Sequence, residues 1–257
     1  MKRFDRFRQI RELLEERGNA STVFLAKALG LSESSVRRDI NRMASLPQYP
    51  DVRRVHGGVV LERDVAGLEY MFELKLELNR GLKQRVAAEA ARLVEDGDSI
   101  VIDSGTTCLY LARRLADRRG LRIVTTDLKV AEELGKHGGI ESNIIGGLIR
   151  PGYYTVGGIV ALENLERFSA EKVFLSVDAI DLEHGITNAS EFEVGIKQRL
   201  LRMAGQVYVI CDRTKVGTHT LYRVADTREA RTIVTNRGLD ERLAARLRAA
   251  GVVLALA

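Results

Sequence analysis

Apolar residues recur every three or four positions over the first 43 residues, and this spacing predicts a succession of short amphipathic helices. Ser21 or Thr22 is placed to cap the second of them, because a hydroxyl side chain accepts a hydrogen bond from the free N–H groups at a helix start. Gly30 then permits a sharp turn, and Ser32 caps a third helix that runs to about Met43. The predicted order is helix, helix, turn, helix.

Residues 52–61 alternate between apolar and polar positions around Gly57-Gly58, which predicts a two-stranded hairpin, or wing, after the third helix. Residues 62–79 combine mixed charge with apolar side chains and are expected to form an extended connector or a short strand laid on the next domain. The pattern therefore predicts a winged helix-turn-helix domain over 1–61 and a linker over 62–79.

From residue 80 onward the chain alternates between amphipathic helices and short apolar runs, which predicts an α/β domain with a mainly parallel sheet over 80–257. Helical segments are expected at 86–94, 109–115 and 130–134. The runs that predict strands are 99–102, 123–125, 143–145, 173–177, 207–210, 232–235 and 252–254.

The positive charge of the chain is concentrated in its first quarter. Residues 1–60 hold 12 of the 40 Lys and Arg and 7 of the 35 Asp and Glu, so the remaining residues hold 28 of each sign and are neutral. A cationic block attracts a polyanion through counterion release, and the neutral remainder is left for another task. Charge alone is equally compatible with a solvated, Arg-rich helical surface.

The third predicted helix carries side chains suited to DNA. Val36, Ile40 and Met43 fall on one face, which leaves hydroxyl, guanidinium and amide groups on the others. The residues expected to bind DNA, taken from the helix starts, the third helix and the wing, are Ser21, Thr22, Ser34, Ser35, Arg37, Arg38, Asn41, Arg53, Arg54 and His56.

Within this set the roles differ. Ser35 and Arg37 are expected at or beside base edges and Arg38 at a phosphate, because guanidinium groups serve both contacts. The alternative for Arg38 is a structural ion pair with its neighbour Asp39. His56 is interpreted as a hydrogen-bond donor rather than a catalytic base, since no nucleophile or orienting carboxylate stands at a recognisable spacing.

Small polar residues follow several predicted strands, at the edge where ligands bind in parallel sheets. Residues 103–107 follow one strand and lead into a helix, and residues 125–127 follow the next. A hydroxyl-bearing loop with glycine at a helix start offers N–H groups and short donors to an anionic oxygen, as a phosphate requires. One such loop is compatible with an ordinary capped turn, but several at successive strand ends favour a shared binding site.

The candidate effector site combines these loops with charged residues further along the chain. Lys215 is a candidate counter-charge for a phosphate, and Asp103 or Asp178 for sugar hydroxyls. Each is equally compatible with a routine surface pair. The residues expected at the effector are Asp103, Ser104, Gly105, Thr106, Thr107, Thr126, Asp127, Gly146, Gly147, Asp178, Glu191, Glu193, Lys197 and Lys215.

Several classes of protein are disfavoured by what the sequence lacks. The chain has no apolar run near 18 residues and no secretory signal at its charged start, which predicts a cytoplasmic protein without a membrane span. Cys108 and Cys211 have no partner spacing and are expected to be reduced. The four histidines are scattered and near no second ligand, so neither a metal site nor a cofactor is expected.

The ordered series of motifs resembles the DeoR family of bacterial sugar-metabolism repressors over nearly the whole chain. An isolated motif would be weak, but the order of the series is strongly specific. The segments that carry the resemblance are 35–40 and 54–58 in the first domain and 103–107, 124–127, 146–147, 177–181, 185–187 and 212–217 in the second.

This resemblance implies a second domain similar to the ribose-phosphate isomerase and CoA-transferase folds. It implies a double-stranded DNA operator as partner, a phosphorylated sugar or related metabolite as the effector that releases DNA, and a dimer or tetramer. Asp127 stands where the family usually has asparagine, and an acid there weakens anion binding unless it turns away or pairs with a cation.

Two alternatives to a repressor remain at this point. A sugar-phosphate isomerase with a DNA-binding extension would use Asp103, Asp178, Glu191 or Glu193 as the base and Lys215 as the electrophile, but spacing singles out no acid and base pair. An activator would have the same architecture, because the sign of regulation depends on where the operator lies relative to the promoter.

Overall fold

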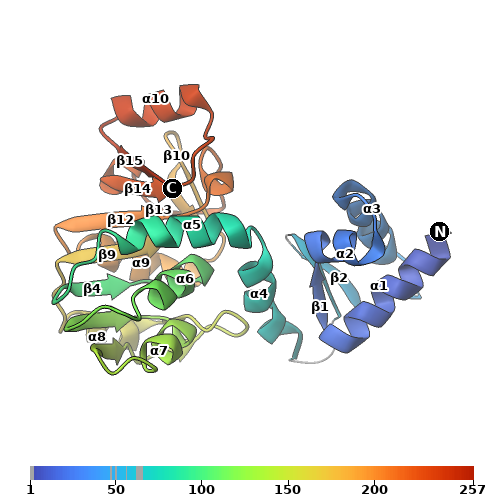
Figure 1. The fold of residues 1–257 in the computed structure, drawn as a ribbon, viewed down its shortest axis with the longest axis horizontal. Coiled ribbons are helices and arrows are strands. Elements are labelled where there is room, and N and C mark those ends of the chain that lie inside the picture. Colours follow the sequence, from blue (N-terminus) through green and yellow to red (C-terminus); the bar gives the residue numbers. More distant parts are fainter. Residues whose placement is uncertain (1–2, 47, 50, 56, 62–65) are drawn as a thin grey trace. The chain divides into compact units, whose positions relative to one another are not determined.

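The computed structural model describes residues 3–46, 48–49, 51–55, 57–61 and 66–257 (Figure 1). The chain divides into two compact units, the first comprising residues 1–78 with 151–153 and the second comprising 79–150 with 154–257. Each unit has its own hydrophobic core. Among the described residues, no helix combines the length and apolar character needed to cross a lipid bilayer.

The first unit packs helices against a small antiparallel sheet of strand order β1-β3-β2. The predicted helix-turn-helix and the wing that follows it are confirmed. Its elements are α1 (Arg3–Arg17), β1 (Asn19–Ser21), α2 (Thr22–Leu29), α3 (Glu33–Met43), β2 (Val52–Val55), β3 (Gly58–Leu61) and α4 (Ala66–Glu77).

Short side-chain caps explain where α2 and α3 begin. Ser21 Oγ accepts a hydrogen bond from the N–H of Phe24 at 3.0 Å, and Ser32 Oγ accepts one from the N–H of Ser35 at 3.3 Å. Between the two helices Gly30 has a φ of 64°, a left-handed conformation that glycine adopts without steric cost. The two serine caps and Gly30 therefore define the turn that separates α2 from α3.

The core of the first unit is formed by one face of each helix and the inner side of the sheet. Burial of these side chains holds α3 against α1 and α2, and leaves the opposite face of α3 outward. The buried members are Phe7, Ile10, Leu14, Ala20, Leu25, Ala26, Val36, Ile40, Met43, Val52, Val59 and Leu61.

Helix α4 differs from the sequence prediction of an extended connector or strand. Its apolar residues occupy every second position, as in a strand, but the segment is rich in Leu, Glu, Lys and Met, which favour helices. The helix contacts β1 and β3, and Leu74 is buried. A Cβ added at Gly58 would lie 3.2 Å from Leu74 Cδ2, so the small residue allows this close approach.

The second unit is built on a seven-stranded sheet of order β15-β14-β12-β9-β4-β5-β6, in which every pair of neighbours is parallel. This confirms the predicted α/β class. The elements of the sheet and its helices are α5 (Arg80–Ala91), β4 (Ser99–Ile102), α6 (Thr106–Arg114), β5 (Leu121–Thr125), α7 (Leu128–Leu134), β6 (Ile140–Ile144), α8 (Ile159–Leu165), β9 (Lys172–Ser176), α9 (Val194–Leu201), β12 (Gln206–Ile210), β14 (Thr232–Thr235), α10 (Glu241–Ala249) and β15 (Val253–Leu256).

Helices pack on the sheet in two groups. Helices α5, α6 and α7 lie next to one another, with α5 and α6 in front of the sheet in Figure 1. Helix α8 packs on α9, and Ile196 and Leu200 of α9 share a core cluster with Val173 and Leu175 of β9. Because alternate residues of a strand point to opposite faces, Phe174 faces away from that cluster.

Shorter strands flank the main sheet. An antiparallel sheet of order β10-β11-β13 and a two-stranded ladder β7-β8 are inserted between its helices and strands. Gly185, at the start of β11, has a φ of 84°, and a Cβ added there would lie 2.1 Å from the carbonyl oxygen of Ala225. The remaining elements are β7 (Leu148–Ile149), β8 (Val156–Gly157), β10 (Ala179–Asp181), β11 (Gly185–Asn188), β13 (Tyr222–Ala225) and the 3-10 turns η1 (Glu191–Glu193), η2 (Arg213–Lys215) and η3 (Thr227–Glu229).

Candidate DNA-binding surface and effector site

Helix α3 places its apolar residues inward and several polar ones outward, as the sequence predicts. Ser34, Arg37, Arg38 and Asn41 are exposed, and Ser35 is half-buried. The Ser35 hydroxyl accepts a hydrogen bond from the hydroxyl of Ser32, the N-cap of the same helix, and remains at the surface. The outward face of α3 is thus rich in donors that suit phosphates and base edges.

The carboxylate of Asp39 is withdrawn from this face. It forms a two-pronged ion pair with Arg6 of α1, with Arg6 Nε 2.6 Å from Oδ2 and a second guanidinium nitrogen 3.0 Å from Oδ1. The hydrogen bond to Asp39 raises the pKa of Arg6 above its ordinary value. Asp39 therefore pairs with Arg6, and the alternative pairing with Arg38 is wrong, because the helical turn directs neighbouring side chains to different faces.

The outward arginines make weak contacts within their own helix. Arg38 donates to Ser35 Oγ at 3.4 Å, and Arg37 lies 3.3 Å from Glu33 with both side chains about half exposed or more. Ion pairs of this exposed kind contribute little to stability. A phosphate can therefore replace Glu33 as the partner of Arg37 at small cost.

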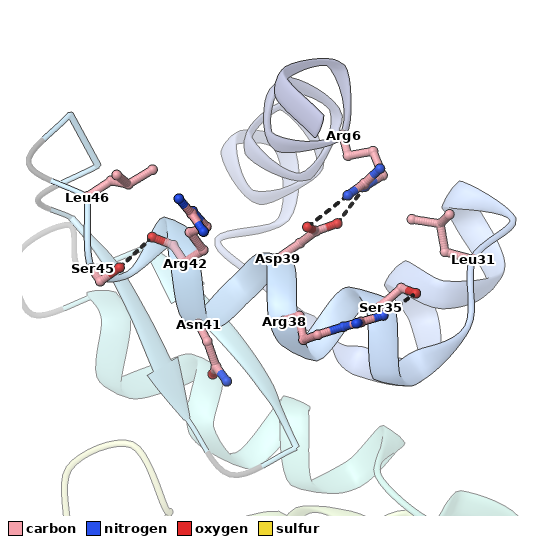
Figure 2. Close-up of a pocket in the computed structure, with 9 residues that line it drawn as sticks. All are labelled: Arg6, Leu31, Ser35, Arg38, Asp39, Asn41, Arg42, Ser45 and Leu46. Atoms are coloured by element: carbon pink, nitrogen blue, oxygen red, sulfur yellow. Dashed lines mark hydrogen bonds and ion pairs between the residues drawn. The ribbon is translucent and has the colours of Figure 1, made fainter. Parts of the chain in front are cut away.

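An open hollow of about 710 Å³ runs along the junction of α1 and α3. Figure 2 shows Arg38 lying toward Ser35 on one side of it, while Asp39 points to Arg6. The exposed Arg42 also lines the hollow and was missed by the sequence analysis, although it follows Arg38 by one helical turn. The lining residues are Arg6, Leu31, Ser35, Arg38, Asp39, Asn41, Arg42, Ser45 and Leu46.

The other predicted DNA residues lie in different environments. Ser21 and Thr22 are buried, and their hydroxyls serve the protein itself: Ser21 caps α2, and Thr22 Oγ1 donates to the carbonyl of Gly57 at 3.0 Å. Arg53 and Arg54 are exposed on β2 of the wing. The remaining candidate, His56, lies outside the described residues.

In the second unit, the loops after neighbouring strands β5, β4 and β9 are joined by hydrogen bonds. The N–H of Gly105, after β4, donates to Asp127 Oδ2, after β5, at 2.9 Å. Asp103 Oδ2 accepts from the N–H of Ser176, at the end of β9, at 3.1 Å. The carboxyl ends of parallel strands share one edge of a sheet, so these predicted residues lie close together.

A buried ion pair occupies the middle of this edge. Lys197 Nζ of α9 lies 2.5 Å from Asp103 Oδ2 and donates to the carbonyl of Ser176 at 2.8 Å. The two charged side chains are 2% and 1% exposed. Burial alone lowers the pKa of Lys197, but the carboxylates of Asp103 and Glu193 raise it above its ordinary value, so the ammonium stays charged.

Glu193 is held by a second set of partners. Its Oε1 lies 2.5 Å from a guanidinium nitrogen of Arg150, and its Oε2 accepts from Asn188 Nδ2 at 2.8 Å. Arg150 follows β7 and was not among the predicted residues, although it comes soon after the predicted Gly146-Gly147. The Arg150 guanidinium thus lies beside the Glu193 carboxylate, which also faces Lys197.

Three buried polar atoms near this network have no hydrogen-bond partner among the residues that the structure describes. They are Asp103 Oδ1, Thr126 Oγ1 and Asn188 Oδ1. Burying a polar atom without a partner costs about 1–3 kcal/mol, and a bound ligand is one way to supply the missing hydrogen bond. Two of them belong to residues that the sequence predicted for the effector.

Asp127 is fully buried and caps α7. Its Oδ1 accepts from the N–H groups of Lys129 at 2.8 Å and Val130 at 3.0 Å, while its Oδ2 holds Gly105. Burial raises the pKa of Asp127 to about 6, against the opposing effect of these N–H donors. Both carboxylate oxygens of Asp127 therefore accept hydrogen bonds from the loop after β4 and from the start of α7.

The remaining effector candidates are spread more widely. Lys215 Nζ donates to the carbonyl of Val177 at 2.6 Å, beside the end of β9. Asp178 Oδ2 accepts from the N–H of Ala189 at 3.0 Å. Ser104, Thr106 and Thr107 are buried at the start of α6, whereas Gly146, Gly147 and Glu191 are exposed.

Comparisons with known proteins agree with this architecture. Residues 78–237 match the family model described as the DeoR C terminal sensor domain, and residues 6–64 match the DeoR-like helix-turn-helix domain. A transcriptional regulator of the sgc region of Escherichia coli (strain K12) is 40% identical, covering 98% of this chain and 96% of the relative. An aga operon transcriptional repressor of Escherichia coli O157:H7 is 29% identical, covering 98% of this chain and 93% of the relative.

A further regulator and a solved structure are also similar to parts of this chain. The HTH-type transcriptional regulator IolR of Bacillus subtilis (strain 168) is 29% identical, covering 92% of both chains. Among solved structures, a ribose 5-phosphate isomerase of Methanocaldococcus jannaschii matches with a TM-score of 0.41 at 19% identity, covering 54% of this chain and 55% of that one. At this level the likeness extends to neither activity nor ligand.

We expect Asp127→Asn to flatten the pH dependence of stability. A folded-state pKa of about 6 means that the native protein retains a proton the unfolded chain has already released near pH 4. The contribution of Asp127 is therefore complete below about pH 4 and is lost as the pH rises through 6. Urea unfolding should show that wild type loses about 2 kcal/mol more than Asp127→Asn between pH 4 and 7. The exposed carboxylate of Asp117 supplies a control, Asp117→Asn, and equal pH slopes in all three proteins would contradict the assignment.

Proposed function

This chain belongs to the DeoR family of transcriptional regulators, and we propose that it represses carbohydrate catabolism genes and leaves its operator when a phosphorylated sugar or related metabolite binds. One observation carries the DNA-binding part. Helix α3 turns Asp39 inward to Arg6 and presents Arg37, Arg38 and Asn41 to solvent. We place the protein in the cytoplasm, where its operator is found.

The cationic face of α3 supports insertion in the major groove of DNA. Its core face is fully used for packing, so only the outward side chains are left for bases and phosphates. The ion pair of Asp39 with Arg6 fixes the helix against α1, so the backbone that carries Arg37 and Arg38 is ordered before DNA binds. Arg53 and Arg54 of the wing supply further phosphate contacts.

The polar edge of the second unit supports a ligand rich in hydroxyl groups. Asp103 Oδ1 and Asn188 Oδ1 are buried acceptors, and a sugar hydroxyl donates to such atoms. Thr126 Oγ1 can donate or accept, so it accommodates either role of a hydroxyl. Binding would supply the hydrogen bonds that these atoms lack, which favours the ligand-bound state.

A phosphate group is accommodated at the start of α6. The N-cap of this nine-residue helix is Gly105, which offers no side-chain cap to the free N–H groups. Ser104 and Thr106 add hydroxyls, and Lys215 supplies a counter-charge from the loop after β12. Helix starts of this kind bind anions through their N–H groups and dipole.

The isomerase alternative is not favoured. The family and the relatives are regulators by name. Asp103 and Glu193, two of the candidate bases, are held in ion pairs with Lys197 and Arg150. The same residues are suited to binding.

We also propose that the protein is a homo-oligomer that joins through an apolar surface on β6, β7 and α8. Several large side chains there are exposed, and Leu148 and Ile159 reach 65% and 70%. A Cβ added at Gly158, the N-cap of α8, would lie 3.6 Å from Leu148, so the strand and the helix adjoin. A second copy would bury this surface and pair two DNA-reading heads. Its members are Ile144, Leu148, Ile149, Ile159 and Val160.

Arg37→Ala and Arg38→Ala should each weaken binding to the promoter region of the regulated genes, by roughly 1–3 kcal/mol where the side chain reads a base. Both residues are exposed, so folding should be unchanged. Fluorescence anisotropy at constant salt measures the effect. Arg92→Ala removes a guanidinium that is 78% exposed in the second unit and should bind like wild type. Wild-type affinity in both α3 variants would refute the proposed face.

Lys215→Ala should keep operator affinity and lose the response to the effector. A thermal-shift screen against sugar phosphates first identifies a stabilising compound, and anisotropy then measures how far that compound releases DNA. Lys136→Ala serves as control, because Lys136 is exposed and pairs locally with Glu133. Release of Lys215→Ala at the wild-type concentration of compound would exclude Lys215 from the effector site.

Leu148→Glu combined with Ile159→Glu should convert the oligomer to monomers in sedimentation velocity, since two buried carboxylates would face their copies across the interface. Leu221→Glu is the matched control, because Leu221 is 80% exposed on a different segment, before β13. An unchanged sedimentation coefficient in the double variant would locate the interface elsewhere.

A further inference from the structure

Two histidines and an aspartate that the effector site does not use converge in the second unit. Asp181 ends β10, His184 lies in the turn to β11, and His219 lies in the loop before β13. Asp181 Oδ2 is 3.0 Å from His184 Nδ1 and 3.7 Å from His219 Nδ1. The sequence expectation that no histidine stands near a second ligand is wrong for this pair, because the fold joins segments that are distant along the chain.

The donor atoms are close enough to share one ion. One potential ligand atom from each of the three residues lies within 4.8 Å of the others. The two imidazole rings stack with centroids 3.8 Å apart and planes 18° apart, and the Nδ1 atom of each ring is the one that lies near Asp181 Oδ2. Bonds of about 2.0–2.1 Å in a tetrahedral site require donor separations of roughly 3.4 Å. Because an imidazole binds a metal in its ring plane, the two stacked rings must turn out of parallel to share an ion, and their partial exposure leaves room for that turn.

Asp181 is already oriented for this role. Its Oδ1 accepts hydrogen bonds from the backbone N–H groups of Glu183 at 2.8 Å and His184 at 2.6 Å. These bonds hold the carboxylate in the turn and direct Oδ2 toward the rings. The histidine side chains are 42% and 56% exposed, so an ion can reach them from solvent and retain water as a further ligand.

The backbone on both sides of the cluster is fastened. The loop that carries His219 is tied to the β10-β11 hairpin by Gly217 N–H to the Ile180 carbonyl, at 2.8 Å, and by Thr220 N–H to Thr187 Oγ1, at 2.9 Å. The carbonyl of Asp181 also accepts from a threonine hydroxyl of η3. The three ligands therefore meet with little loss of backbone freedom.

We propose that Asp181, His184 and His219 bind one divalent transition-metal ion of the zinc class. Two imidazoles with one carboxylate favour Zn²⁺, Co²⁺, Ni²⁺ or Cu²⁺, whereas Mg²⁺ and Ca²⁺ prefer sets of oxygen ligands. The bound ion cross-links the β10-β11 hairpin to the loop that begins directly after Lys215. This inference is independent of the proposed effector and DNA contacts.

Isothermal titration of the chelator-treated full-length protein with Zn²⁺ tests the proposal, and Co²⁺ absorption in the visible range reports the geometry. Wild type should bind one ion per chain. His184→Ala and His219→Ala should each weaken Zn²⁺ binding at least tenfold, and Mg²⁺ should give no saturable binding. Both histidines are partly exposed, so these variants should keep the wild-type melting temperature without metal.

His137→Ala is the control, because His137 lies near Glu133 on a different segment and should not affect the ion. Zn²⁺ affinity that is equal in wild type and the His184→Ala/His219→Ala double variant would overturn the proposal. The same holds for a wild type that binds no Zn²⁺, or for loss of the ion in His137→Ala alone.

Discussion

The ion pair between Lys197 and Asp103 is the interaction around which the polar edge of the second unit is arranged. Neither charge is stable in the dry interior without the other, so the two side chains hold their positions together. Asp103 continues β4, Ser176 ends β9, and Lys197 belongs to α9; one network therefore fastens two central strands to a helix. The loops that we assign to the effector extend from this fixed centre.

The first unit also contains an ion pair between two secondary-structure elements. Arg6 and Asp39 neutralise each other between α1 and α3, and this removes one acid from the side of α3 that meets solvent. The net charge of the outward face of α3 is therefore set by this contact between two helices as well as by composition. In both units, an ion pair between two secondary-structure elements fixes the position of the neighbouring groups that we assign to a ligand.

The order of elements was predictable because it rests on local signals. Helix caps such as Ser21 and Ser32, and alternation of helices with apolar runs after residue 80, need no knowledge of distant partners. Contacts between distant segments were not predictable from spacing. The partner of Asp39 lies on another helix, and His184 meets His219 only because β11 pairs with β13. Helix α4 was misjudged because an alternating pattern outweighed its helix-forming composition.

The residue that follows α4 lies close to the bend of the wing. A Cβ added at Gly57, in the bend of the wing, would lie 2.9 Å from Leu78 Cδ2, and Leu78 is the last residue before the second unit begins at Asn79. A larger side chain at Gly57 would therefore collide with Leu78 unless one of the two segments moved, so the bend of the wing and the segment after α4 constrain each other within the first unit.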